Sequence, residues 1–184
     1  MEYYAKNEMP WQKQGLGMIH VCFGTGVGKT SRAVGLAIRA AGAGLNVHFI
    51  QFMKSGDSAE AAILRQLPQV QYYCPGPFPF VLEKGPEPVH FQHVESTMAR
   101  VEAALKTDQQ VLICDEILNA LLFKILRLEQ VLELIDRCRG RVELVLTGSA
   151  APPEIVAVAD YVTEFVQIKH PYYSGASARH GVEF

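Results

Sequence analysis

A glycine-rich segment, GTGVGKT at residues 24–30, restricts the fold more than any other part of this sequence. An apolar run at 18–23 precedes it, and a helix-forming run rich in Ala, Leu and Ile follows at 31–41. A strand, a Gly-rich turn ending in Lys-Thr and a helix are the context that a phosphate-binding loop requires. Successive N–H groups and the helix dipole favour anions, Lys29 adds a positive charge, and Thr30 can offer a hydroxyl to Mg²⁺. The alternative is a Gly-rich turn of an ordinary α/β protein.

This loop departs from the general phosphate-loop pattern at one position. The pattern G-x-x-x-x-G-K-[ST] has glycine where this chain has Phe23, and the glycines stand instead at 24, 26 and 28. We therefore interpret the loop as a variant, in which the usual orientation of ATP is not assumed.

Short apolar runs alternate with helical patterns along the rest of the chain. Strands are expected at 46–52, 70–73, 111–114, 142–146 and 161–166. Helices are expected at 59–67, at 91–105, from the residues after 116 to about 138, and at 152–159. This alternation predicts an α/β fold with a mainly parallel central sheet that helices cover on both faces.

Two segments between or before these elements are expected to be irregular. Residues 1–17 are polar and are predicted to form a flexible N-terminal lead, and residues 18–184 a single domain. The stretch 74–88 is rich in proline and must be a loop. The helix after it is amphipathic, because five apolar residues recur at spacings of three and four: Phe91, Val94, Met98, Val101 and Leu105.

Composition and charge argue against several classes of protein. The chain has 184 residues, 49% of them hydrophobic, and a formal net charge of -2, so a basic surface for nucleic acid is not expected. No stretch reaches the roughly 18 apolar residues that a membrane span needs. The four cysteines form no C-x-x-C pair, which argues against a zinc site or a disulfide framework and favours the cytoplasm.

An acidic pair closes the predicted strand at 111–114. Asp115 and Glu116 follow the apolar run directly, where phosphate-loop proteins place a carboxylate that binds Mg²⁺ directly or through water. The alternative for Asp115 is to cap the helix that follows.

Other side chains are open to two readings each. Arg39, ten residues after Lys29, could reach a phosphate or a partner subunit, or be a solvated helix arginine. His90 and His93 have the spacing of a metal-binding pair, but with no third ligand evident we expect a surface pair. The aromatic residues of the Pro-rich loop, Phe78 and Phe80, could bind a ligand or pack onto the core. Lys169 and His170 could contact a phosphate or carboxylate, or belong to a solvated tail.

Several segments together resemble one family, in the family's order and over most of residues 18–184. They are FGTGVGKTSRAVGLAIRAAGAGLNVHFIQFMKSG, LICDEILNAL, LEQVLELI, VLTG, APPEIVAVADYVTEF and IKHPYYSGASARHGVEF. The chain resembles the P-loop cob(I)yrinic acid a,c-diamide or cob(I)alamin (corrinoid) adenosyltransferases.

The resemblance implies a RecA-like P-loop fold, a homodimer, and a reaction in which the adenosyl group of ATP moves to the cobalt of a corrinoid. It implies ATP bound in reversed orientation, with Mg²⁺, and leaves room for an electron-donor protein. Lys29, Thr30 and Glu116 are the implied catalytic residues, and Thr30, Glu116 and Asp115 the implied metal ligands. The implied contacts to ATP are Gly24, Thr25, Gly26, Val27, Gly28, Lys29, Thr30, Ser31 and Arg39, and those to the corrinoid are Phe78 and Phe80, which displace the lower ligand of cobalt.

The chain differs from the family at several of these places. Val27 and Ser177 replace usual lysines, Ser149 a common arginine, Tyr173 a usual aspartate, and Phe80 the commoner tryptophan. The loss of two cations near the nucleotide leaves a second hypothesis open, a P-loop ATP- or corrinoid-binding carrier or regulator with little turnover. A kinase or ATPase is a third, although no activating base is evident.

Overall fold

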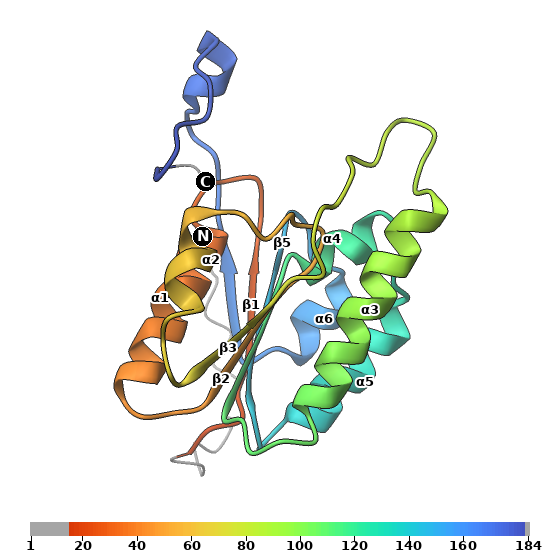
Figure 1. Ribbon diagram of the computed structural model, residues 1–184. Helices are drawn as coiled ribbons and strands as arrows, with labels where there is room; N and C mark the ends of the chain where they lie inside the picture. Colours follow the sequence, from red (N-terminus) through yellow and green to blue (C-terminus); the bar gives the residue numbers. More distant parts are fainter. Residues whose placement is uncertain (1–14, 183–184) are drawn as a thin grey trace, which may run out of the picture.

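Six parallel strands form one sheet in the computed structural model, which describes residues 15–182 (Figure 1). The strand order is β3-β2-β4-β5-β1-β6, and every neighbouring pair is parallel. The prediction of an α/β fold with a parallel sheet is therefore confirmed. The strands are β1 (Ile19–Phe23), β2 (Val47–Gln51), β3 (Val70–Tyr73), β4 (Val111–Asp115), β5 (Glu143–Gly148) and β6 (Tyr161–Glu164).

Helices cover both faces of this sheet (Figure 1). Helices α1 (Lys29–Gly42) and α2 (Ala59–Leu64) pack on one face. Helices α3 (Pro88–Ala104), α5 (Leu128–Cys138) and α6 (Pro153–Val158) pack on the other, and the short α4 (Ile117–Leu122) follows β4 directly. Because the sheet is covered on both faces, the inner strands β2 and β4 are buried at every residue, and most of their side chains are apolar.

Alternate residues of each central strand serve two separate cores. In β4, Leu112 and Cys114 pack with α3 and α5, whereas Val111 and Ile113 pack with α1. Side chains of a strand point to opposite faces in turn, so one apolar run supplies both cores. Cys22 and Cys114 are buried in their strands as small apolar side chains, as predicted, and all four cysteines are free thiols.

The helical stretch predicted up to about residue 138 is wrong in one respect, because it is two helices. Helix α4 ends at Leu122, and Lys124 adopts a left-handed conformation with φ 58°. The N–H groups of Ile125 and Leu126 then both bond to the carbonyl of Ala120, a tight helix ending. Leu126 becomes buried, and the chain turns into α5.

Helix α3 is amphipathic as predicted, but its buried face is rotated. Val94 and Val101 are buried as expected, whereas Phe91 is 44% exposed. The predicted surface pair is wrong: His90 and His93 are 2% and 8% exposed. They lie beneath the Pro-rich loop, which provides hydrogen-bond partners that a periodicity argument does not contain.

The chain after β6 leads away from the body of the domain (Figure 1, top). It contains one short 3-10 helix, Pro171–Ser174, and its apolar side chains are open to solvent, with Ile168 90% exposed. The predicted N-terminal lead lies, up to residue 14, outside the described residues. Among residues 15–182, no helix has the length and hydropathy to cross a bilayer.

Strand β4, in the middle of the sheet, contributes completely buried side chains to the core. Ile113→Ala removes a fully buried side chain and should lower the free energy of unfolding by about 2–5 kcal/mol, because a cavity remains. Urea unfolding would measure this. Ile63→Ala, at a position 53% exposed, is the matched control and should change stability by less than about 1 kcal/mol. Equal effects at both positions would contradict the assignment of the core.

Candidate active site

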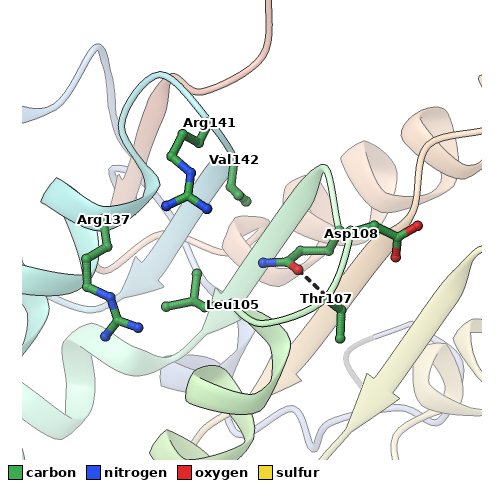
Figure 2. A pocket seen from close by; sticks show the side chains of 7 residues that line it. Leu105, Thr107, Asp108, Arg137, Arg141 and Val142 are labelled. Atoms are coloured by element: carbon green, nitrogen blue, oxygen red, sulfur yellow. Dashed lines mark hydrogen bonds between the residues drawn. The ribbon is translucent and has the colours of Figure 1, made fainter.

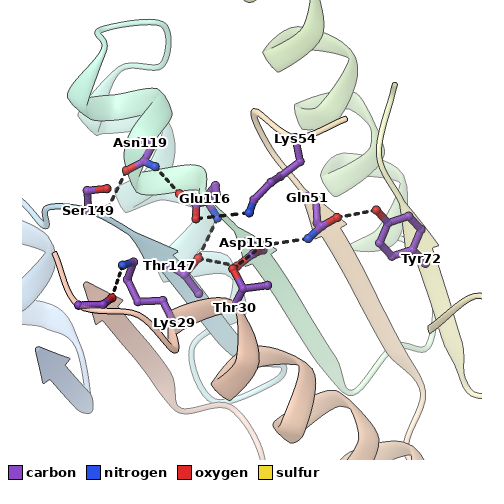
Figure 3. Close-up of polar contacts among 11 residues, drawn as sticks. Lys29, Thr30, Gln51, Lys54, Tyr72, Asp115, Glu116, Asn119, Thr147 and Ser149 are labelled. Atoms are coloured by element: carbon purple, nitrogen blue, oxygen red, sulfur yellow. Dashed lines mark hydrogen bonds and ion pairs between the residues drawn. The ribbon is translucent and has the colours of Figure 1, made fainter. Parts of the chain in front are cut away.

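The carboxyl ends of β1, β2, β4 and β5 meet at one edge of the sheet, and the glycine-rich loop lies there between β1 and α1 (Figure 3). Ligands of open parallel sheets bind at this edge. The predicted site residues Lys29, Thr30, Asp115 and Glu116 all lie at this edge. The two predicted motifs, phosphate loop and acidic pair, are therefore brought together.

The backbone after β6 packs directly against the glycine-rich loop. Phe165 donates its N–H to the carbonyl of Phe23 and accepts a hydrogen bond from Gly26, both at 2.7 Å. A Cβ at Gly24 would lie 2.4 Å from the Phe165 carbonyl oxygen, and one at Gly26 2.8 Å from its carbonyl carbon. These contacts explain why the loop has glycines at 24 and 26, and the third, Gly28, has a φ of 107° at the start of α1.

The glycine-rich loop ends at the N-terminus of α1, where no side chain caps the helix. Gly28, the N-cap of α1, offers no capping side chain, so N–H groups of the first turn stay available to an anion. The ammonium of Lys29 donates to the carbonyl of Gly26 at 2.7 Å, in the same loop. A phosphate group would compete with that neutral carbonyl for Lys29, and its negative charge makes it the stronger partner.

A buried carboxylate organises the floor of the site. Asp115 is fully buried, and three side-chain donors from three elements satisfy it. Thr147 of β5 donates to Oδ1 at 2.7 Å, Gln51 of β2 donates to Oδ2 at 3.1 Å, and Thr30 of α1 lies 3.1 and 3.2 Å from the two oxygens. Because a buried charge is costly unless its hydrogen bonds are made, this set of donors defines one arrangement of the strand ends.

A hydrogen-bond chain continues from Asp115 across β2 to β3, the outermost strand on that side of the sheet (Figure 3). The hydroxyl of Tyr72 donates to Oε1 of Gln51 at 2.5 Å, while Nε2 of Gln51 donates to Asp115. Burial raises the pKa of the Tyr72 hydroxyl, so it stays a donor at neutral pH. The guanidinium of Arg65 lies over the Tyr72 ring, 4.5 Å from its centroid. The amide of Gln51 is thus fixed in one orientation.

Glu116 occupies a strained backbone position. Its φ is 65°, in the left-handed region, which costs a residue with a Cβ roughly 1–2 kcal/mol. The Glu116 N–H donates to the Thr147 hydroxyl at 2.8 Å, and Asn119 donates to Oε2. Oε1 lies 4.0 Å from the ammonium of Lys54, which follows Met53, another left-handed residue. Such strain is typical of a functional position.

The carboxyl of Glu116 is poorly stabilised in its charged form. Burial, and then the nearby charge of Asp115, raise its pKa, and Lys54 and Lys29 only partly oppose them. Added positive charge would relieve this. The donor set of Thr30, Asp115 and Glu116 fits Mg²⁺, which commonly takes one or two carboxylates and completes its shell with phosphate oxygens and water. Asp115 already accepts from three donors, so Glu116 has the carboxylate that could bind such an ion directly.

The remaining residues predicted to contact ATP do not all lie near the glycine-rich loop. Thr25, Val27 and Ser31 are exposed on the loop and the first turn of α1, and Val27 is 71% exposed. Arg39 lies in the last turn of α1, about 15 Å along the helix from Lys29 at roughly 1.5 Å per residue. The structure therefore does not bring Arg39 to the loop of its own chain.

The two aromatic residues of the Pro-rich loop differ in their surroundings. Phe78 is half-buried against His90 and His93, with ring centroids 5.0 and 4.8 Å apart. Phe80 is 89% exposed. In the tail, His170 accepts a hydrogen bond from Tyr172 at 3.1 Å, and the solvated reading of this segment agrees with its exposure.

Sequence reasoning did not assign a role to Thr147, Gln51 or Phe165. Thr147 and Gln51 are each the polar residue at the end of an apolar strand, a signal that could have marked them as neighbours of Asp115. Phe165 acts through its backbone, and no side-chain pattern could have identified it.

A cavity of about 170 Å³ lies at the opposite edge of the sheet (Figure 2). Both terminal nitrogens of Arg137 already donate to Glu102, at 2.6 and 2.9 Å. The C-terminal ends of α3 and α5 adjoin this space, and helix C-termini disfavour anions. We therefore do not place the site here. The cavity is lined by Leu105, Thr107, Asp108, Gln109, Arg137, Arg141 and Val142.

The packing of Phe165 on the loop can be tested at Gly26. Gly26→Ala should weaken ATP binding about tenfold or more, roughly 1.4 kcal/mol, because the new Cβ would force the loop away from Phe165. Isothermal titration would measure the dissociation constant. Gly35→Ala, in the middle of α1 with open space around it, is the control and should leave ATP affinity unchanged. Equal affinity for Gly26→Ala and the unaltered protein would refute the packing argument.

Removing the charge of Glu116 should stabilise the ligand-free protein. The folded pKa of Glu116 is raised, so the folded state binds the proton more tightly and stability falls as pH rises through that pKa. Glu116→Gln should raise the Tm at pH 7, by roughly 2–4 °C for each kcal/mol relieved. The gain should vanish below the ordinary carboxyl pKa of 4.5.

Thermal melts between pH 4 and 8 would follow this difference. Glu95→Gln, at an exposed position of α3, is the matched control and should show no such pH dependence. In the presence of Mg²⁺ and ATP the unaltered protein should gain more stability than Glu116→Gln. A lower Tm for Glu116→Gln at pH 7 would contradict the electrostatic argument.

Comparison with known proteins shows the family of this chain. The family described as ATP:corrinoid adenosyltransferase BtuR/CobO/CobP matches residues 15–184. A corrinoid adenosyltransferase of Pseudomonas aeruginosa is 35% identical over 178 residues, which cover 91% of this chain and 84% of that protein. The corrinoid adenosyltransferase CobA of Salmonella typhimurium is 28% identical, with 91% and 86% covered, and one from Sinorhizobium sp is 29% identical, with 91% and 80% covered. A phosphate loop facing a carboxylate pair, and a family match over nearly the whole chain, establish that this protein belongs to the ATP:corrinoid adenosyltransferase family.

Proposed function

We propose that this chain transfers the 5′-deoxyadenosyl group of ATP to the Co(I) centre of cobalamin or one of its precursors, with release of triphosphate. The family match over residues 15–184 supports the reaction. The observation that carries the assignment to this edge of the sheet is the convergence of Lys29, Thr30 and Glu116 around one space (Figure 3).

The reaction needs no base from the protein. The Co(I) centre of the substrate is a nucleophile; its electron pair forms the bond to C5′ of ATP. The bond between C5′ and the triphosphate oxygen breaks, and its electron pair leaves with triphosphate, so cobalt becomes formally Co(III). The task left to the protein is to orient C5′ toward cobalt and to stabilise the negative charge that gathers on the leaving group.

The loop residues suit that second task. Lys29 would exchange the Gly26 carbonyl for a phosphate oxygen, and the free N–H groups at the start of α1 would donate to the same anion. Thr30 and Glu116 would hold Mg²⁺, with Asp115 fixing the Thr30 hydroxyl. When bound, the ion supplies positive charge to the triphosphate. The N–H of Gly26 is already bonded to Phe165 and contributes to loop shape rather than to phosphate binding.

We assign the corrinoid to the side of the site bordered by the Pro-rich loop. Phe78 and Phe80 carry no atom that coordinates cobalt, so they can occupy its lower face without replacing the ligand they displace. A four-coordinate cobalt is easier to reduce, which would favour formation of Co(I) from Co(II). A homodimer and an electron-donor protein remain predictions from the resemblance, and a cytoplasmic location remains a prediction from the cysteine pattern.

An anaerobic spectral assay would test the proposal. Purified protein, Mg²⁺-ATP and chemically reduced cob(I)alamin should give loss of the Co(I) absorbance and formation of light-sensitive adenosylcobalamin. Lys29→Ala should lower the rate about 100-fold or more, the scale of losing one charged donor to the developing anion. Lys106→Ala, at an exposed position beyond the far end of α3, is the matched control and should retain the full rate.

A negative result has a defined meaning. No product from the unaltered protein, with ATP still bound, would refute the transferase and favour a binding protein. Restoring cations by Val27→Lys and Ser149→Arg would then show whether these two positions account for the loss.

A further inference from the structure

We infer that His90 and His93 are positioning residues that anchor the Pro-rich loop and fix Phe78, so that the corrinoid meets a preformed surface. This pair, with Phe78 between the two rings, is called the histidine clamp below. The inference rests on the proposed function, because it concerns the corrinoid side of that site. The loop rises beside the start of α3, beyond the edge of the sheet where the site lies (Figure 1).

The composition of this loop leaves it short of its own donors. Pro75, Pro77 and Pro79 have no N–H group, so alternate residues of the segment cannot donate backbone hydrogen bonds. Its carbonyl groups need donors from elsewhere. Two of them, on Gly76 and Pro79, lie 3.1 Å from histidine Nε2 atoms of α3.

His90 uses both ring nitrogens. Nδ1 accepts a hydrogen bond from the N–H of Glu87 at 2.7 Å, at the start of α3. Since Nδ1 is an acceptor, the proton of the neutral ring is on Nε2, which donates to the carbonyl of Pro79. The same side chain therefore caps α3 and anchors the loop. The ring is 2% exposed, which excludes competition from water.

His93 makes the second anchor, one turn further along the helix. Its Nε2 donates to the carbonyl of Gly76 at 3.1 Å. Burial lowers the pKa of His93, which favours the neutral ring that this geometry needs. His93 is 8% exposed, so its Nε2 donor serves the loop carbonyl rather than water.

Phe78 lies between the two anchored carbonyls and contacts both histidines. Its ring is tilted by 58° to His90 and lies edge-on to His93 at 78°. Such edge-to-face pairs at about 5 Å are favourable. Phe80, two residues further along, is 89% exposed and makes no such ring contact with the residues that the structure describes. The clamp thus gives the two aromatic residues different roles. Phe78 is held in one orientation beside the corrinoid, whereas Phe80 is free to rotate onto it.

The root of the loop, outside the clamp, is also joined to the nucleotide side of the site. Cys74, at the root of the loop, donates to the carbonyl of Lys54 at 3.2 Å, and the Lys54 ammonium lies 4.0 Å from Glu116. A loop fixed at both its root and its middle loses less conformational freedom when a ligand binds, and therefore binds more tightly.

Two substitutions remove the anchors while keeping the rest of each side chain's role. His93→Phe keeps a ring beside Phe78 and loses the donor to Gly76, whereas His93→Gln keeps a donor at the position of Nε2. His90→Asn keeps an acceptor for Glu87 and loses the donor to Pro79.

We expect His93→Phe and His90→Asn each to raise the KM for corrinoid about tenfold, as a lost buried hydrogen bond worth about 1.4 kcal/mol would. The KM for ATP should stay within about twofold, because the ATP side keeps its contacts. His93→Gln should restore the corrinoid KM to within about threefold of the unaltered protein.

A second measurement does not depend on activity. Lys84 is exposed within the loop, so the rate of tryptic cleavage after Lys84 in the ligand-free protein reports how firmly the loop is held. We expect that rate to rise about tenfold in His93→Phe and His90→Asn. Cleavage after Lys106, beyond the far end of α3, is the internal control and should not change.

The outcomes separate the two proposals. An unaltered protein that neither binds nor adenosylates corrinoid refutes the proposed function, and this inference with it. A protein that transfers normally, with unchanged corrinoid KM and unchanged cleavage after Lys84 in His90→Asn, refutes the clamp alone. If His93→Phe fails to fold, His90→Asn decides, since it retains the helix cap.

Discussion

The buried carboxylate of Asp115 is the interaction on which the site depends. A charge with no exposed surface is tolerated only where several donors meet it, and here each donor comes from a different element: Thr147 from β5, Gln51 from β2 and Thr30 from α1. Satisfying one carboxylate therefore brings three strand ends and the phosphate loop into register. The hydroxyl of Thr147 also accepts from the N–H of Glu116, so the same network supports the strained backbone of that residue.

The site combines one carboxylate that accepts several hydrogen bonds with another whose charged form is poorly stabilised. Asp115 has three donors, whereas Glu116 lies in a left-handed conformation, with a pKa raised by burial and by Asp115 itself. Two adjacent carboxylates thus have different surroundings: the hydrogen bonds of Asp115 are made, whereas the charged form of Glu116 is poorly stabilised. Under the proposed function, binding of a cation beside Glu116 would relieve this unfavourable state and so would add to the free energy of binding. This is the trade between stability and function that strained sites commonly show.

The sequence predicted the parts of this protein that depend on short-range pattern. Strand and helix alternation indicated the parallel sheet, and the positions of Lys29, Thr30, Asp115 and Glu116 indicated the edge at which they meet. It did not predict contacts that depend on distant segments. The contact of Phe165 with Gly26 joins residues far apart in the chain through backbone atoms, which leave no signature in residue type. His90 and His93 looked like surface residues because their partners, the carbonyls of Gly76 and Pro79, exist only once the loop has folded over α3.

The position of Phe165 has a consequence for the order in which the protein becomes competent. The glycine-rich loop is near the beginning of the chain, yet the backbone that packs against it follows β6, the last strand. During synthesis the loop, β1 and α1 emerge early, without the segment that shapes them. The nucleotide site is therefore still incomplete when the segment that contains the glycine-rich motif has been synthesised. It has to await nearly the whole polypeptide, and an incomplete chain that already displays GTGVGKT would still lack the backbone against which that loop is formed.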